Sequence, residues 1–103
     1  MIPLEKKRHF HLLELLEDKK SHTLDEYRES LIEKFNLTDS DINEKQNSSK
    51  EYPTSKTKFQ NRTAGDVSEL KSKKHLEHSE TAIFRITELG LTHLYYLRSI
   101  GEK

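Results

Sequence analysis

The chain has 103 residues, of which 31% are hydrophobic and 35% are charged, and its net charge is zero. That length fits one domain with a modest core, so we expect a single domain spanning residues 1–103. The absence of cysteine excludes disulfides and thiolate metal sites, and the balanced charge argues against a surface that binds polyanions all over. Because there is no apolar run of membrane-spanning length and no signal-peptide pattern, the sequence favours a cytoplasmic protein without a membrane partner.

The first predicted helix covers residues 4–18 and belongs to the scaffold. Leu12, Leu15 and Leu16 recur at helical spacing, with Phe10 and Leu13 beside them, so one face of the helix is apolar. This face is expected to contribute to the core.

The second predicted helix begins after Thr23 and ends near Phe35. Thr23 and Glu26 match a capping box, in which each side chain accepts a hydrogen bond from the other residue's backbone N–H. Thr38 and Asp41 repeat the pattern after Asn36, which predicts one further helical turn. The next stretch, residues 43–54, has almost nothing to bury, so we expect a flexible surface loop inside the domain. A solvated connector is favoured there over a segment whose Lys45 and Lys50 touch DNA.

The third predicted helix, residues 55–72, is the main candidate for function. Phe59, Thr63, Val67 and Leu70 share one face, which should pack inward. Asn can pair with adenine, and Arg or Lys with guanine or a phosphate. Gly65 in mid-helix costs about 1 kcal/mol relative to Ala, which a close approach to a ligand or a neighbouring helix would explain. The opposite face is predicted to carry Thr57, Lys58, Asn61, Gly65, Ser68 and Ser72, with Arg62 on its flank.

Positive charge is concentrated around this helix. Residues 1–54 hold nine Lys/Arg against twelve Asp/Glu, whereas residues 55–78 hold six against three. A local excess of this kind suits a phosphate-contacting face, although an ordinary solvated helix gives the same pattern.

A short β-hairpin is predicted next, with Leu76 and His78 on one arm and Ile83, Phe84 and Ile86 on the other. Arg85 should point away from the core because it alternates with apolar neighbours. The tip, residues 79–82, has no basic residue. The hairpin is therefore a weaker DNA-binding candidate than the helix before it.

The last predicted helix is capped by Thr87. Leu91, Leu94, Tyr95 and Leu97 are expected to form its packing face, and Tyr96 and Ile100 add apolar surface. This surplus predicts either further core packing or a homodimer surface made by Leu94, Tyr95, Tyr96 and Ile100.

Six segments of the chain, in this order, carry a family resemblance. They are F-H-L-L-E-L-L-E-D-K-K-S-H-T-L-D-E-Y-R-E-S-L (10–31), N-L-T-D-S-D (36–41), S-S-K (48–50), F-Q-N-R (59–62), L-K (70–71) and F-R-I-T-E-L-G (84–90). Together they resemble the N-terminal domain of Mrr-type restriction proteins. The resemblance implies a winged helix that recognises DNA ahead of a nuclease domain of the PD-(D/E)xK type. The chain departs from the family where Gly65 replaces a Trp, and where Lys74-His75-Leu76 replaces a Gly-Leu turn with one extra residue.

The sequence thus predicts an α+β, mainly helical fold. It is a winged helix-turn-helix with a three-helix core, a short two-stranded wing and a C-terminal helix. The leading function is double-stranded DNA binding, with helix 55–72 in the major groove and the domain targeting a restriction-type system. The alternatives are a protein-interaction or dimerisation module and a stand-alone transcriptional regulator. The expected DNA-binding residues are Lys56, Thr57, Lys58, Asn61, Arg62, Gly65, Lys71, Lys73 and Lys74.

Catalytic and metal-binding patterns are weak. Glu69-Leu70-Lys71 has the spelling of a nuclease motif, but with Asp66 it is better interpreted as a solvated helix face. The pairs His75/His78 and His9/His11 lack the cysteine or spaced carboxylates of a usual zinc site. We therefore expect no enzyme activity in this chain, no cofactor and no metal.

Overall fold

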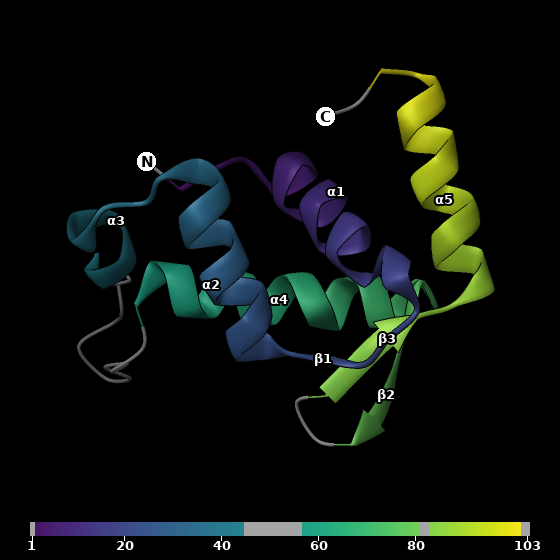
Figure 1. Ribbon diagram of the computed structural model, residues 1–103. Helices are drawn as coiled ribbons and strands as arrows, with labels where there is room; N and C mark the ends of the chain where they lie inside the picture. Colours follow the sequence, from purple (N-terminus) through teal and green to yellow (C-terminus); the bar gives the residue numbers. More distant parts are fainter. Residues whose placement is uncertain (1, 45–56, 81–82, 102–103) are drawn as a thin grey trace.

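The computed structural model describes residues 2–44, 57–80 and 83–101, which form five α-helices, a 3₁₀ turn and a three-stranded sheet (Figure 1). The chain is α+β and mainly helical, as predicted. In these described ranges no helix is both long and apolar enough to cross a bilayer. In chain order the elements are α1 (Glu5–Leu15), η1 (Leu16–Asp18), β1 (His22–Thr23), α2 (Leu24–Phe35), α3 (Asp39–Asn43), α4 (Lys58–Ser72), β2 (Leu76–Glu80), β3 (Ile83–Ile86) and α5 (Glu88–Ser99).

Helix starts follow the polar residues that the sequence places before them. Thr23 accepts from the Glu26 N–H at 3.1 Å and donates its own N–H to the Glu26 carboxylate at 3.3 Å, which confirms the capping box of α2. Thr38 and Asp41 make the same pair of bonds and start α3, the predicted extra turn. Asn36, with φ of 51°, ends α2 in the left-handed region that Asn tolerates.

The predicted flexible loop, residues 43–54, lies only partly within the described ranges. Asn43 is the last residue of α3, and Glu44 follows it; the rest of the loop, including both of its lysines, lies outside the described residues. The carbonyl oxygen of Glu44 accepts from the Lys58 N–H at 2.9 Å, and their side chains pair at 3.0 Å. The end of α3 and the start of α4 are therefore held together.

The sheet has the strand order β1–β3–β2, with both pairings antiparallel. The hairpin is present as predicted, but the wing has a third strand because His22 and Thr23 pair with Phe84 and Ile83. The order of helices and strands, with a short strand between the first two helices, is consistent with a winged helix.

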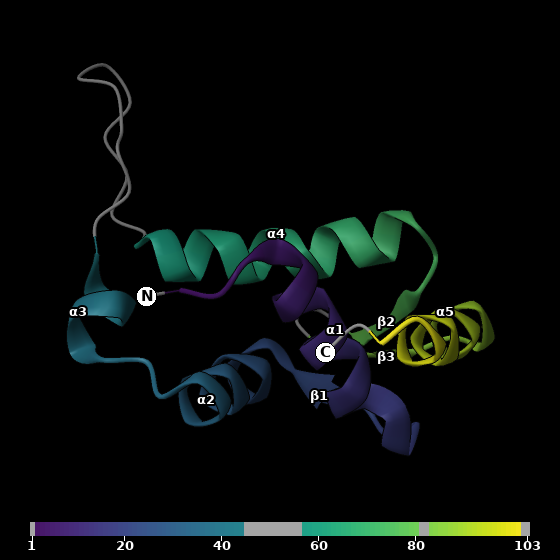
Figure 2. The ribbon, with the colours of Figure 1, turned by 90° about the horizontal axis from the view of Figure 1, so that it is seen from above.

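Three helices enclose the core. Figure 2 shows α4 along one edge of the molecule and α2 along the other, with α1 between them. Burying a large apolar side chain contributes about 1.5–3 kcal/mol, so a set of this size can hold a domain of modest length. The fully buried large side chains of this core are Tyr27, Phe59, Phe84, Leu12, Leu13, Leu16, Leu31, Leu70 and Leu94.

Helix α5 packs by a narrower stripe than the sequence suggested. Leu94 is completely buried, so its predicted place in a dimer surface is wrong. Tyr95, predicted to pack inward, is 53% exposed, because one residue along a helix turns the side chain by roughly 100° from Leu94. Gly90 is required by this packing: a Cβ there would lie 2.3 Å from the carbonyl oxygen of His75.

Candidate nucleic-acid interface

Helix α4 separates its residues into an inward and an outward face. The inward face is buried and confirms the predicted set of Phe59, Thr63, Val67 and Leu70. We define the outward face as the five exposed residues opposite this set. They are Asn61, Arg62, Gly65, Ser68 and Ser72.

The N-terminal end of α4 is occupied by contacts within the chain. The helix begins at Lys58, so Thr57, predicted to be helical, is its N-cap instead, and its hydroxyl accepts from the Gln60 N–H at 3.1 Å. The Lys58 ammonium pairs with Glu44. Lys56 lies outside the described residues. Both described side chains at this end therefore already have partners.

Asn61 and Arg62 differ from these two residues. Both are exposed, and neither side chain has a hydrogen bond or an ion pair within the described ranges. An ideal Cβ built on the neighbouring Gly65 meets nothing within 4 Å, so no described helix or strand requires a glycine there. In the described part of the chain, close packing against a neighbouring helix is therefore not the reason for a glycine at this position. This central stretch of α4 thus has exposed polar side chains that pair with nothing in the described part of the chain.

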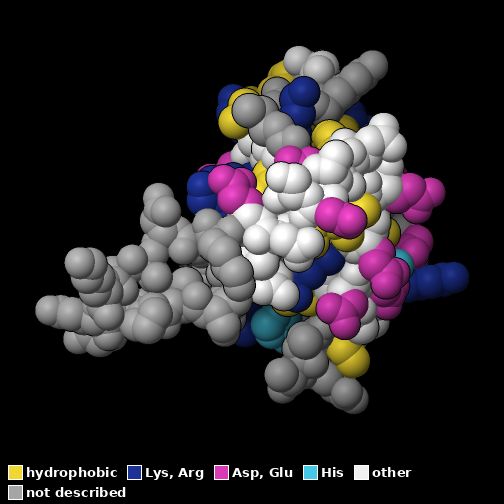
Figure 3. Space-filling model, turned by 90° about the vertical axis from the view of Figure 1, so that its left-hand side faces the viewer, with side chains coloured by type: hydrophobic (Ala, Val, Ile, Leu, Met, Phe, Trp, Pro, Cys, Tyr) yellow, Lys and Arg dark blue, Asp and Glu magenta, His cyan; other side chains and the backbone are white. Residues whose placement is uncertain are grey.

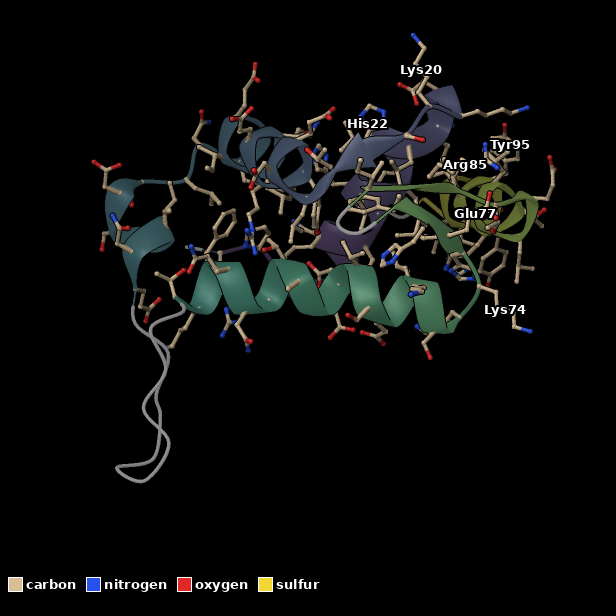
Figure 4. All side chains as sticks on the ribbon, turned by 90° about the horizontal axis from the view of Figure 1, so that it is seen from below. Lys20, His22, Lys74, Glu77, Arg85 and Tyr95 are labelled. Carbon is tan, nitrogen blue, oxygen red and sulfur yellow. The ribbon has the colours of Figure 1, made fainter. Side chains whose placement is uncertain are left out.

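Three lysines follow at the C-terminal end of α4. Lys71 is exposed, with its Nζ 3.2 Å from Nδ1 of His78, and Lys73 lies 3.5 Å from the Glu69 carboxylate. Lys74 reaches into solvent beyond the helix end (Figure 4). All three lysines are exposed at the surface.

Lys74 also has an unusual backbone. Its φ of 65° lies in the left-handed region, which costs a residue with a side chain roughly 1–2 kcal/mol. Its carbonyl oxygen accepts from the Thr87 hydroxyl at 2.6 Å, which fixes the turn between α4 and β2. The position matches the place where the sequence departs from a Gly-Leu turn.

A buried polar cluster fixes the position of α4. Arg8 donates from Nε to Oδ2 of Asp66 at 2.8 Å and from Nη2 to Oδ1 at 2.9 Å. The Tyr27 hydroxyl donates to Oδ2 at 2.8 Å, and Nε2 of His9 lies 3.1 Å from Oδ1. Burial alone would raise the pKa of Asp66, but its bonds with His9 and Arg8 outweigh burial and lower the pKa. Asp66 is therefore an ionised anchor of α1 and α2 to α4.

This anchor was not predicted from the sequence. Asp66 was interpreted with Glu69 as part of a solvated face, yet Asp66 is only 2% exposed. Its spacing of three from Thr63 and four from Leu70 was the available signal, since it places Asp66 at the edge of the inward face. The partners Arg8 and Tyr27 are far away in the sequence and gave no such signal.

Helix α2 presents the opposite charge. Figure 3 shows acidic side chains gathered to the right of centre, on the side of the molecule where α2 lies. By contrast, the acidic residues of α4 are the buried Asp66 and the half-buried Glu69. The exposed acidic side chains of α2 are Asp25, Glu26, Glu29 and Glu33.

The hairpin contributes little free positive charge. Arg85 points outward, as predicted, but its Nε donates to Glu77 on the neighbouring strand at 2.6 Å (Figure 4). Residues 81–82 at the tip lie outside the described residues. The described part of the wing is thus better suited to support than to phosphate contact.

The residues within each of the nuclease-like and zinc-like patterns do not converge on one point. Glu69 faces Lys73 and His9, whereas Lys71 faces His78. In the histidine pairs, His75 stacks on His93 with ring centroids 4.5 Å apart, and His11 contacts the Ser30 hydroxyl. Among the described residues, only His9 of the four histidines in these pairs belongs to a group of three convergent ligand atoms, and its companions there are Glu5 and Glu69.

The surface of α5 is apolar outside its packing stripe. Tyr95 is 53%, Tyr96 57% and Ile100 56% exposed. Of the four residues of the predicted dimer surface, these three are exposed, whereas Leu94 belongs to the core.

Comparison with known families assigns the chain. The family model described as the Mrr N-terminal domain matches residues 8–95, which is most of the chain, so the chain belongs to this family. The match begins within α1, includes α2 to α4 and the hairpin, and ends within α5. Neither the curated proteins nor the solved structures gave a match.

Proposed function

We propose that this domain binds double-stranded DNA, with the outward face of α4 in the major groove, as the targeting module of a restriction-type system. The observation that carries the proposal is one exposed helix face on which Asn61 and Arg62 have no partner within the described residues. No acidic residue of α4 belongs to this face: Asp66 is buried, and the half-buried Glu69 pairs with Lys73. Membership of the Mrr N-terminal family supports the association with restriction systems.

Different residues in and around the outward face are suited to contact bases and phosphates. Asn61 can form two hydrogen bonds with adenine, and Arg62 can do so with guanine or hold a phosphate. Gly65 lets the helix backbone come close to the groove, because there is no side chain in the way. Thr57 and Lys58 are expected to act with these residues, although each already has a partner within the chain. The residues expected to contact phosphates are Lys56, Lys71, Lys73 and Lys74.

Fluorescence anisotropy with labelled duplexes tests the proposal. The chain should bind mixed-sequence or methylated duplexes at low salt, and log Kd should rise linearly with log salt concentration as counterions are released. Arg62→Ala should weaken binding by roughly tenfold, since a good base or phosphate contact contributes about 1–3 kcal/mol. Glu33→Ala, on the exposed face of α2, is the matched control and should bind at least as tightly as the wild type.

Two outcomes would overturn the proposal. One is the absence of binding to every duplex at low salt. The other is equal binding by wild type and Arg62→Ala, which would place the contact elsewhere on the molecule.

A second candidate function is self-association through α5. Tyr95, Tyr96 and Ile100 expose more than half of their surface on one terminal helix, and exposed apolar patches on small domains often mark interfaces. Light scattering of the wild type and of a Tyr95→Ser/Tyr96→Ser variant tests it. A dimer mass that falls to the monomer mass in the variant supports self-association, and a wild-type monomer at high concentration excludes it.

A further inference from the structure

Three ligand-type side chains converge where α1 crosses the C-terminal half of α4. Nε2 of His9 lies 3.8 Å from Oε1 of Glu5 and 3.7 Å from Oε2 of Glu69. One ligand atom from each residue lies within 4.8 Å of the others. Ligand atoms around a tetrahedral zinc ion are separated by roughly 3.3 Å, from bond lengths of about 2.0–2.2 Å. Small rotations of the two glutamate side chains would reach that spacing.

His9 can bind a cation because Asp66 keeps other hydrogen bonds when His9 leaves it. Nε2 of His9 lies 3.1 Å from Oδ1 of Asp66, but that carboxylate also accepts two bonds from Arg8 and one from Tyr27. A carboxylate has about four acceptor positions. If His9 binds a cation instead, Arg8 and Tyr27 still donate three hydrogen bonds to Asp66. The fold would keep its buried anchor.

The two glutamates approach each other on either side of His9. Among the described residues, the ion pair of Glu5 is with His9, and Glu69 uses its other oxygen, Oε1, toward Lys73. One carboxylate oxygen of Glu5 and one of Glu69 lie within 4.8 Å of each other. Two carboxyl groups that approach this closely share a proton or a cation.

Access to this cluster is open. Glu5 and His9 line a cleft of about 480 Å³, together with Lys6, Lys73, His93, Leu97 and Ile100. A hydrated ion can therefore reach the cluster without local unfolding. Water molecules could complete the coordination from the cleft.

We propose that Glu5, His9 and Glu69 form a binding site for a divalent transition-metal ion, with one imidazole and two carboxylates as ligands and water at the open positions. The imidazole selects Zn²⁺ and its first-row neighbours over Mg²⁺ and Ca²⁺, which prefer oxygen ligands alone. The ion joins α1 to α4 beside the buried Asp66 anchor. The site is separate from the outward face and does not depend on the proposed DNA binding.

His22 does not form a comparable site, because its two carboxylate neighbours do not converge on one ring nitrogen. His22 also has two carboxylates, but Asp18 contacts its Nε2 and Glu26 its Nδ1, on opposite edges of the ring. No common point lies near both carboxylates and one nitrogen. His22 is therefore expected to stay in its ion pairs.

Zinc titration of the full chain without DNA tests the proposal. Calorimetry should show one Zn²⁺ ion per chain, and ¹H–¹⁵N spectra of the histidine rings should show a changed Nε2 resonance for His9. Glu5→Gln and Glu69→Gln should each weaken zinc binding by at least about tenfold, since even outer-shell changes cost that much. Glu29→Gln on α2 is the matched control and should leave the affinity unchanged; circular dichroism checks that each variant is folded.

Three results would contradict the proposed zinc site. No binding up to about 100 μM free Zn²⁺ would exclude a Kd below that concentration and with it the proposed site. Equal affinity in the wild type and Glu69→Gln, or a response at His22 instead of His9, would assign any bound zinc to another place.

Discussion

The two faces of α4 use polar residues in opposite ways. On the inward side, Asp66 is 2% exposed and has three kinds of partner, Arg8, Tyr27 and His9. On the outward side, Asn61 and Arg62 are exposed and have no partner within the described ranges. A buried polar group with a complete set of partners holds a fold together, whereas exposed groups without partners contribute little to stability. The comparison separates the residues that keep α4 in place from those available for a ligand.

The largest expected effect is on the inward side. Asp66→Ala should lower the free energy of unfolding by about 3–5 kcal/mol, because it leaves the buried Arg8 guanidinium without its counter-ion. Urea unfolding followed by circular dichroism measures the change. Ser68→Ala, two residues away on the outward face, is the control and should stay within about 0.5 kcal/mol of the wild type. A loss below about 1 kcal/mol for Asp66→Ala would show that the cluster is not an anchor.

Two helical glycines, Gly65 on the outward face of α4 and Gly90 in α5, should respond in opposite ways to replacement by alanine. Gly65→Ala should stabilise the chain by about 0.5–1 kcal/mol, since a Cβ there meets no described atom within 4 Å and Ala is the better helix former. The same variant should weaken DNA binding several-fold if the backbone approaches the groove. Gly90→Ala, by contrast, should destabilise the fold, because its Cβ would lie 2.3 Å from the His75 carbonyl oxygen. A Gly65→Ala variant that gains stability and keeps full DNA affinity would remove Gly65 from the interface.

The smallest expected effect is a pH dependence of stability, caused by the stacked rings of His75, which follows α4, and His93 of α5. Burial, with a smaller contribution from the neighbouring His93, lowers the pKa of His75, and burial also lowers the pKa of His93. The unfolded chain therefore takes up protons first as the pH falls below about 6.5, and stability should decline from there toward the lowered pKa values.

His22 provides the opposite sign. Burial would lower its pKa, but hydrogen bonds with Glu26 and Asp18 outweigh burial and raise the pKa. Its stabilising contribution is present below about pH 6.5 and is lost as the pH rises through the raised pKa. Thermal unfolding between pH 5.5 and 7.5 should show a shallower acid loss in His93→Gln and a steeper one in His22→Gln. Identical profiles for both variants would contradict these assignments.

Local patterns in the sequence predicted the elements well. The caps at Thr23, Thr38 and Thr87 were visible because each depends on residues within four positions. The inward face of α4 followed from spacing alone. Strand β1 was harder to predict, because a two-residue strand is defined by its partner β3, about sixty residues away.

The site was predictable only in part. The exposure of Asn61 and Arg62 followed from helical periodicity, but Thr57 turned out to be the cap and Lys58 to be paired with Glu44. The Glu5, His9 and Glu69 cluster joins two helices that are distant in the sequence. Only the packing of α1 against α4 brings those side chains together.

The most direct test of the account is an NMR titration of the ¹⁵N-labelled chain with a short DNA duplex. Amide shifts should concentrate on α4, at Asn61, Arg62 and Gly65, and at the lysines that follow it. The exposed face of α2 should remain unchanged. Shifts confined to α5 or to α2, or no shifts at low salt, would contradict the claim that the outward face of α4 contacts DNA.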